Sequence, residues 1–170
     1  MAKKAGTRTA ARTSKQPELA ITRILHAPVG RVWKAWTVPE EMKKWWGPKE
    51  FTTPFCTIDL RVGGLFRYCM RAPDGKEFWG RGIYNEIIPN RRLVVTDSFT
   101  DETGKVVPAT HYGMSSETPR EMLVTVTFEE VPGGTKLTLR HVGIPVGPDS
   151  EGANTGWSQS FDKLAELVEE

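Results

Sequence analysis

Four of the six tryptophans in this 170-residue chain fall within one short stretch, at positions 33, 36, 45 and 46. Each indole ring buries on the order of 150–250 Å², so the segment that carries them must organise a large part of the core. At helical spacing its apolar residues form two faces, one of Val32, Trp33 and Trp36 and one of Met42, Trp45 and Trp46. The sequence therefore predicts two short helices. Their rings are either aromatic anchors of a core or walls of a ligand cavity, and the two readings are compatible.

Local signals indicate where these helices begin and end. Pro28 suits a first helical turn. Thr37, followed three residues later by Glu40, matches a capping box, and Pro39 would lie in the first turn of the second helix. Gly47 and the proline after it are expected to end that helix.

The apolar period changes from 3.6 to 2 after about residue 51, which is typical of strands. With an earlier alternating segment at 18–25, we expect strands at 51–62, 65–72, 77–88, 91–100, 121–131 and 135–142. A Pro/Gly-rich linker at 144–153 would lead to an amphipathic helix over 154–169. The apolar stripe of that helix contains Trp157, Phe161, Leu164, Ala165 and Val168.

Glycines mark the irregular points of the predicted sheet. Ile58, Leu60 and Val62 share a face that can coincide with Phe66, Tyr68 and Met70 only across an odd-numbered turn, so we predict a three-residue turn or a glycine bulge at Gly63-Gly64. Gly80 and Gly82 predict a bend or a close backbone approach.

The segment 101–120 has no clear period. An irregular stretch of that length is usually functional or mobile. His111, Tyr112 and Met114 would either cover a cavity mouth or belong to an ordinary flexible loop.

The element order predicts an α+β fold. A curved antiparallel sheet of about seven strands would wrap a long C-terminal helix, with two short helices between strands 1 and 2. This arrangement leaves a space between sheet and helix that suits an apolar ligand.

Charge is unevenly distributed along the chain. Residues 1–17 contain five basic residues and no acidic ones, and the remainder holds 18 basic and 21 acidic residues. We expect residues 1–17 to be a disordered basic tail and residues 18–170 to be a single domain. A net negative domain gives no support to nucleic-acid binding.

The sequence contains no membrane span or signal peptide. Cys56 and Cys69 are expected to be free, buried thiols in a reducing cytoplasm.

Seven phrases resemble one protein superfamily. They are VWKAWT at 32–37, WWGP at 45–48, DLRVGG at 59–64, GRGIY at 80–84, RLVVTDSF at 92–99, VTVTF at 124–128 and GWSQSFDKL at 156–164. In these phrases and in layout the chain is similar to the SRPBCC (START/Bet v 1-like) superfamily, and within it to the activator of heat-shock protein 90 ATPase homologue 1-like domain. The resemblance implies a helix-grip fold with a hydrophobic cavity.

Residue chemistry adds one candidate cluster. The sequence has no P-loop, no G-x-S-x-G elbow and no histidine pair at metal spacing, so we expect no metal or organic cofactor. By alternation His141 and Asp97 both face the core, where polar groups need partners. They are a structural pair, or they orient a ligand's polar end together with Arg81 or Tyr84, or they act in acid/base catalysis.

Three functions remain open. The first is binding of a small hydrophobic or aromatic ligand, the second is interaction with a heat-shock protein 90-type chaperone through an exposed sheet face, and the third is a cyclase or hydrolase activity. For the first, the predicted ligand-binding residues are Trp33, Trp36, Trp46, Tyr68, Met70, Tyr84, Asp97, Phe99, His141, Trp157 and Phe161.

Overall fold

Seven antiparallel strands form one sheet in the computed structural model, which describes residues 16–169. The strands are β1 (Glu18–Leu25), β2 (Thr52–Ile58), β3 (Leu65–Arg71), β4 (Glu77–Ile88), β5 (Arg92–Thr100), β6 (Met122–Val131) and β7 (Gly134–Val142). Strands β2 to β7 are neighbours in chain order, and β1 pairs with β7. Of the segment 1–17, predicted to be a disordered tail, only Gln16 and Pro17 lie within the described residues.

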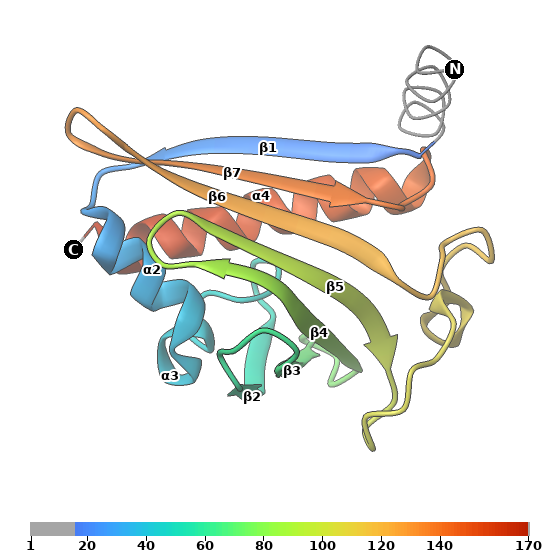
Figure 1. Cartoon of the computed structure of the whole chain (residues 1–170). Helices are drawn as coiled ribbons and strands as arrows, with labels where there is room; N and C mark the ends of the chain where they lie inside the picture. The colour runs from blue at the N-terminus through green and yellow to red at the C-terminus, as the bar shows by residue number, and fades with distance from the viewer. Residues whose placement is uncertain (1–15, 170) are drawn as a thin grey trace, which may run out of the picture.

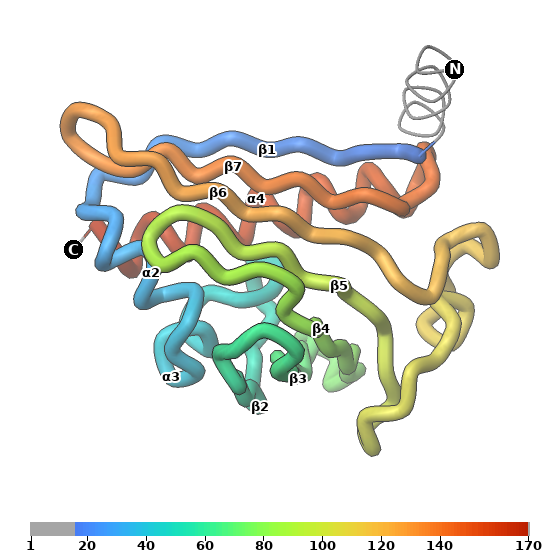
Figure 2. Tube along the Cα trace, in the orientation of Figure 1, coloured from blue at the N-terminus to red at the C-terminus, as the bar shows by residue number. Residues whose placement is uncertain are grey.

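The helices lie at one end of this sheet and across one of its faces. Helices α2 (Val29–Thr37) and α3 (Pro39–Met42) connect β1 to β2, and α4 (Pro148–Val168) follows β7. The short 3-10 helix η1 (Ala109–Tyr112) lies between β5 and β6. The sheet curls around α4, as Figures 1 and 2 show. An ion pair of 2.8 Å between Arg23 of β1 and Asp162 ties α4 to the sheet edge. The predicted α+β helix-grip fold is confirmed.

Strand register sets the inner face of the sheet. The pairing of β5, β6 and β7 aligns two rows of inward side chains, one of Leu93, Val126 and Leu139 and one of Val95, Val124 and His141. The predicted strand 18–25 agrees with β1, and 77–88 agrees with β4. On β5, β6 and β7, period-2 alternation correctly indicates which side chains face inward.

Two glycines of β4 let aromatic rings lie against its backbone. Gly80 is paired with Tyr68 and Gly82 with Phe66. A Cβ added at Gly80 would meet the Tyr68 hydroxyl at 2.3 Å, and one at Gly82 would meet a Val95 methyl carbon at 2.3 Å. The predicted close approach at these glycines is confirmed.

The β2–β3 turn is longer than predicted. Strand β2 ends at Ile58 and β3 begins at Leu65, so a three-residue turn, one of the two predictions for the glycine pair, is wrong. The other prediction, a glycine bulge, agrees with the structure, because Gly63 has a φ of 86° and both glycines bond to the single residue Tyr84. The Gly63 N–H donates to the Tyr84 carbonyl, and the Tyr84 N–H donates to the Gly64 carbonyl. These bonds extend the β3–β4 ladder alone. Leu60 and Val62 consequently lie in the loop and are exposed, although their spacing predicted an inward face.

Two short helices form here as predicted, and Pro39 lies in the first turn of the second one as expected, but the predicted capping box is wrong. The Thr37 hydroxyl donates to the Trp33 carbonyl within α2, and α3 begins after Val38 without a side-chain cap. Helix α3 ends at Met42, before the predicted Gly47 stop. Trp45 follows in a turn, where it is fully buried and its indole N–H donates to the Ala35 carbonyl at 2.9 Å.

Helix α4 begins at Pro148, six residues before the predicted start. The predicted linker over 144–153 is therefore wrong in its second half. Pro148 is the first helical residue, and its missing backbone N–H costs no helical hydrogen bond at that position. Gly152 lies inside the helix, where it is tolerated. Within residues 16–169, no helix has the length and apolar character needed to cross a bilayer.

The two cysteines lie on neighbouring strands without forming a bond. Cys56 is paired with Tyr68, and Cys69 with Phe55, so their side chains point to opposite faces of the hairpin. Both thiols are free and buried, as predicted. Burial raises the pKa of the Cys56 thiol to about 12, which keeps it protonated and unreactive.

Candidate ligand-binding pocket

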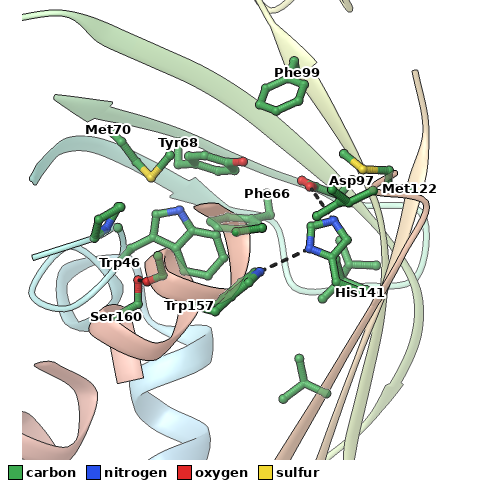
Figure 3. A pocket seen from close by; sticks show the side chains of 18 of the residues that line it. Trp46, Phe66, Tyr68, Met70, Asp97, Phe99, Met122, His141, Trp157 and Ser160 are labelled. Carbon is green, nitrogen blue, oxygen red and sulfur yellow. Dashed lines mark hydrogen bonds and ion pairs between the residues drawn. The ribbon is translucent and has the colours of Figure 1, made fainter. Parts of the chain in front are cut away.

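A pocket of about 400 Å³ lies between the inner face of the sheet and the first half of α4 (Figure 3). Strands β3 to β7 form one wall and α4 forms the other. Helices α2 and α3 and the segments after α3, before β6 and after β7 also contribute to the lining. This volume lies in the range of sites that enclose small organic molecules.

Trp46 forms the aromatic floor of the pocket. Its ring makes edge-to-face contacts with Phe66, Tyr68 and Trp157, with centroid separations of 5.2, 5.3 and 5.2 Å. In this edge-to-face geometry, contacts with the neighbouring rings hold each ring in place. The Trp46 indole N–H has no hydrogen-bond partner among the described residues. The floor is therefore rigid and apolar, with one unused donor.

Small residues form much of the wall on α4. Pro148, Gly152 and Gly156 recur every four residues, and Ala153 lies beside them. Residues four apart share a helix face, so this row presents almost no side-chain volume to the sheet, and the large ring on this wall is that of Trp157. Sequence reasoning missed this wall because it assigned 144–153 to a linker. The small-residue spacing was the signal that could have revealed it.

The other end of the pocket is bordered by the segment between β5 and β6. Met114 and Thr118 of this segment line the pocket, as do Met122 and Ile144. Tyr112 has a different role. Its hydroxyl donates to the Thr100 carbonyl and accepts from the Trp79 N–H, which fixes the segment to the end of the sheet.

Most of the predicted ligand-binding residues meet at this pocket. Those that line it are Trp36, Trp46, Tyr68, Met70, Tyr84, Asp97, Phe99, His141 and Trp157. Trp33 and Phe161 are not among the lining residues. Trp33 packs edge-on against Phe128, with a centroid distance of 5.2 Å, and Phe161 is fully buried in the core. Their apolar faces at helical spacing could not distinguish a core position from a cavity wall.

A small polar cluster lies on the pocket wall beside Trp157. The Trp157 indole N–H donates to His141 Nδ1 at 3.2 Å. His141 Nε2 lies 3.9 Å from Asp97 Oδ2 and has no hydrogen-bond partner among the described residues. His141 is only 6% exposed. Figure 3 shows Trp157, His141 and Asp97 in line on one side of the pocket.

Burial shifts the protonation of this cluster toward neutral forms. It lowers the pKa of His141 to about 4, so the imidazole is uncharged at neutral pH. Burial also raises the pKa of Asp97 to about 7, although hydrogen bonds from the Tyr68 hydroxyl and the Ser98 N–H oppose the shift. The pKa of Tyr68 is raised as well, first by burial and then by the nearby Asp97. The pocket therefore holds polar groups with little fixed charge.

Arg81 does not join this cluster, although it was one of two suggested partners. It is paired with Arg67 across β3 and β4, on the opposite strand face from Gly80 and Gly82. Tyr84, the other suggested partner, lines the pocket. Within residues 16–169, no group of three His, Cys, Asp or Glu side chains is placed to hold a metal ion.

Comparison with known proteins places most of the chain in one family model. The model described as "Activator of Hsp90 ATPase homolog 1-like protein" matches residues 26–169. No curated protein matches the chain.

Several solved structures share its fold. A crystal structure of a protein from Chromobacterium violaceum is 29% identical, with a TM-score of 0.72, over 91% of this chain and 99% of that one. One from Nitrosomonas europaea is 27% identical, with a TM-score of 0.72, over 89% and 94%. A solution structure of a protein from Arthrobacter aurescens is 25% identical, with a TM-score of 0.74, over 89% and 86%.

Proposed function

The chain belongs to the family of activator of Hsp90 ATPase homolog 1-like proteins, and from that premise we propose that it binds a small apolar or aromatic molecule between its sheet and α4. The family's fold is compatible both with ligand binding and with a role beside Hsp90. The choice between them depends on the interior of this particular chain.

The observation that carries the proposal is the pocket itself. About 400 Å³ of space is walled by aromatic and methionine side chains, with Asp97 and His141 as polar groups on one side. Ligand sites in proteins combine a mostly apolar lining with a few placed polar groups in this way. An apolar molecule in a space of this size would make van der Waals contacts with the lining atoms on all sides.

Native mass spectrometry of freshly purified protein, followed by denaturing extraction, tests the proposal. We expect a defined additional mass on the wild-type chain. Ala153→Leu places a large side chain into the pocket while keeping a good helix former, so this variant should lose the additional mass. Asn154→Leu is the matched control because Asn154 is the next residue on α4 and is exposed; it should retain the mass.

Two outcomes would count against the proposal. Retention of the mass by Ala153→Leu would place the ligand outside this pocket. A wild-type chain that neither carries a mass nor gains thermal stability from added aromatic compounds would contradict binding, since a ligand of the folded state must raise its stability.

The second candidate is interaction with an Hsp90-type chaperone, which the family description favours. Exposed apolar side chains also gather at the β2–β3 loop, at Leu60, Val62 and Leu65. If the pocket proves empty, the ATPase rate of a purified Hsp90-type chaperone with and without this chain becomes the deciding measurement.

A further inference from the structure

The hydrogen bond between Trp157 and His141 determines which nitrogen of the imidazole carries the proton. An indole N–H can only donate, so the His141 Nδ1 that it meets at 3.2 Å must be an unprotonated acceptor. A neutral imidazole has one protonated nitrogen, and here that nitrogen is Nε2. His141 therefore presents an N–H donor toward Asp97.

This donor is buried and unused. His141 Nε2 has no hydrogen-bond partner among the described residues, and the 3.9 Å to Asp97 Oδ2 is too long for a hydrogen bond. A buried donor without a partner is destabilising, because it has lost its hydrogen bonds to water. The separation nevertheless allows one oxygen atom to lie at about 2.8 Å from both atoms, which is the usual hydrogen-bond length.

The charge of the lining limits which oxygen-bearing groups can occupy that position. Among the described lining residues there are two carboxyl groups, Asp97 and Asp149, and no lysine or arginine. Asp149 already accepts a hydrogen bond from the Ser115 N–H at 2.8 Å. A ligand carboxylate would meet like charge from ionised Asp97 without any cation to balance it. A ligand ammonium has no lone pair to accept the His141 proton.

A hydroxyl group satisfies both sides. Its oxygen can accept from His141 Nε2 while its proton is donated to the Asp97 carboxylate. If Asp97 is protonated, the same oxygen can accept from both residues. A carbonyl oxygen can accept from His141 and from protonated Asp97, but it has no proton to donate to ionised Asp97.

Resting on the proposed function, we propose that the pocket selects apolar molecules that carry a hydroxyl group, an alcohol or a phenol, held between His141 Nε2 and Asp97. The aromatic floor at Trp46 receives the apolar body, and the polar cluster orients its hydroxyl end. This defines the ligand class by its head group and leaves the body free to vary in shape.

Titration calorimetry with four naphthalenes of nearly equal shape tests the head group. The probe molecules are 2-naphthol, 2-methylnaphthalene, 2-naphthoate and protonated 2-naphthylmethylamine. We expect 2-naphthol to bind the wild-type chain at least about tenfold more tightly than 2-methylnaphthalene, since its oxygen satisfies the buried donor and a methyl group leaves it unpaired. The 2-naphthoate anion should bind more weakly than both, and the ammonium should bind more weakly than 2-naphthol because it leaves the His141 donor unpaired.

Variants at the polar cluster locate the effect. In Asp97→Leu and in His141→Phe, the ratio of the affinity for 2-naphthol to that for 2-methylnaphthalene should fall close to one. Both variants should still bind 2-methylnaphthalene. Asp97→Asn keeps an acceptor oxygen and should retain most of the advantage. Asn154→Leu is the control because Asn154 is exposed on α4 and does not line the pocket; it should leave the ratio unchanged.

The outcomes separate this inference from the proposed function. If 2-methylnaphthalene binds as tightly as 2-naphthol, or if either ion binds tightest, the hydroxyl assignment is overturned and ligand binding stands. If none of the four binds, the pocket is not a site for aromatic molecules, and both conclusions fall. The wild-type affinities alone decide the matter if a variant does not fold.

Discussion

The space between the sheet and α4 is solid at one end and hollow at the other. Toward α2, the helix contributes Phe161 and Leu164, both fully buried, against Leu137 and Leu139 of β7. Toward the start of α4, the helix contributes Gly152, Ala153 and Gly156, and the opposing wall encloses the pocket. One helix thus forms a core with one half and a cavity with the other. Side-chain size along a single helix face makes the difference.

The opposing strand follows the same division. Leu137 and Leu139 of β7 face the solid end, and His141, two residues further along the same face, faces the hollow end. A buried histidine is tolerated there because Trp157 supplies a hydrogen bond and because the space beside it is not filled by packed apolar atoms. The fully buried side chains lie at the solid end, and the buried polar pair lies at the hollow end.

The largest expected effect comes from removing one ring at each end. Phe161→Ala should lower the free energy of unfolding by about 3–5 kcal/mol, because it opens a void inside close-packed atoms. Phe99→Ala should cost roughly half as much, since Phe99 already borders the pocket and has packing partners on fewer sides. Urea denaturation of both variants measures the difference. Equal losses would show that the two ends are packed alike.

An intermediate effect concerns the polar side of the hollow end and depends on pH. The pKa of His141 is lowered from 6.5 to about 4 in the folded chain, so its contribution to stability is lost as the pH falls from about 6.5 to 4. The pKa of Asp97 is raised from 3.8 to about 7, so its contribution has the opposite sign and is lost as the pH rises toward 7. Folded and unfolded chains then bind equal numbers of protons at this pair between about pH 4 and 6.5.

The two residues change the unfolding free energy with pH in opposite directions, and these changes cancel in wild type. Variants at one residue should reveal the change that the other causes. Relative to wild type, Asp97→Asn should lose about 1–2 kcal/mol of unfolding free energy between pH 6.5 and 4.5, because one pKa unit corresponds to about 1.4 kcal/mol. The unfolding free energy of His141→Phe should change by a similar amount with the opposite sign. This variant should become less stable as the pH rises over that interval. Urea denaturation at several pH values measures both. If the plots of unfolding free energy against pH ran parallel to wild type for both variants, neither pKa would be shifted as described.

The solid end was largely predictable from the sequence. Periodicity placed Leu137, Leu139, Phe161 and Leu164 on inward faces, because burial in a packed core leaves a direct apolar pattern. Two local predictions failed where hydrogen bonds to the backbone override the side-chain pattern. Thr37 bonds within its own helix, and the bonds of Gly63 and Gly64 to Tyr84 lengthen the β2–β3 turn.

The hollow end was predictable only in part. His141 and Asp97 were recognisable as polar residues on apolar faces, and the structure brings them to 3.9 Å. The glycine-rich start of α4 was not recognised, because glycine and proline indicate a loop when periodicity is weak. A cavity is a place where side chains are missing, and no apolar pattern marks it. Trp33 and Phe161 show the converse error, since large rings at helical spacing predict burial without distinguishing a wall from a core.

The smallest expected effect comes from exchanging alanine and glycine at the two ends of α4. A Cβ added at Gly152 would have no heavy atom within 4 Å, so Gly152→Ala should raise the free energy of unfolding by about 0.5–1 kcal/mol through helix propensity alone. The reverse exchange, Ala165→Gly, removes a methyl group that packs against the core. It should cost more than 1 kcal/mol, because lost packing adds to lost propensity. Thermal and urea unfolding of the pair measure both values. If Gly152→Ala were instead destabilising, an atom would have to occupy the space beside Gly152, and the first half of α4 would pack as tightly as the second.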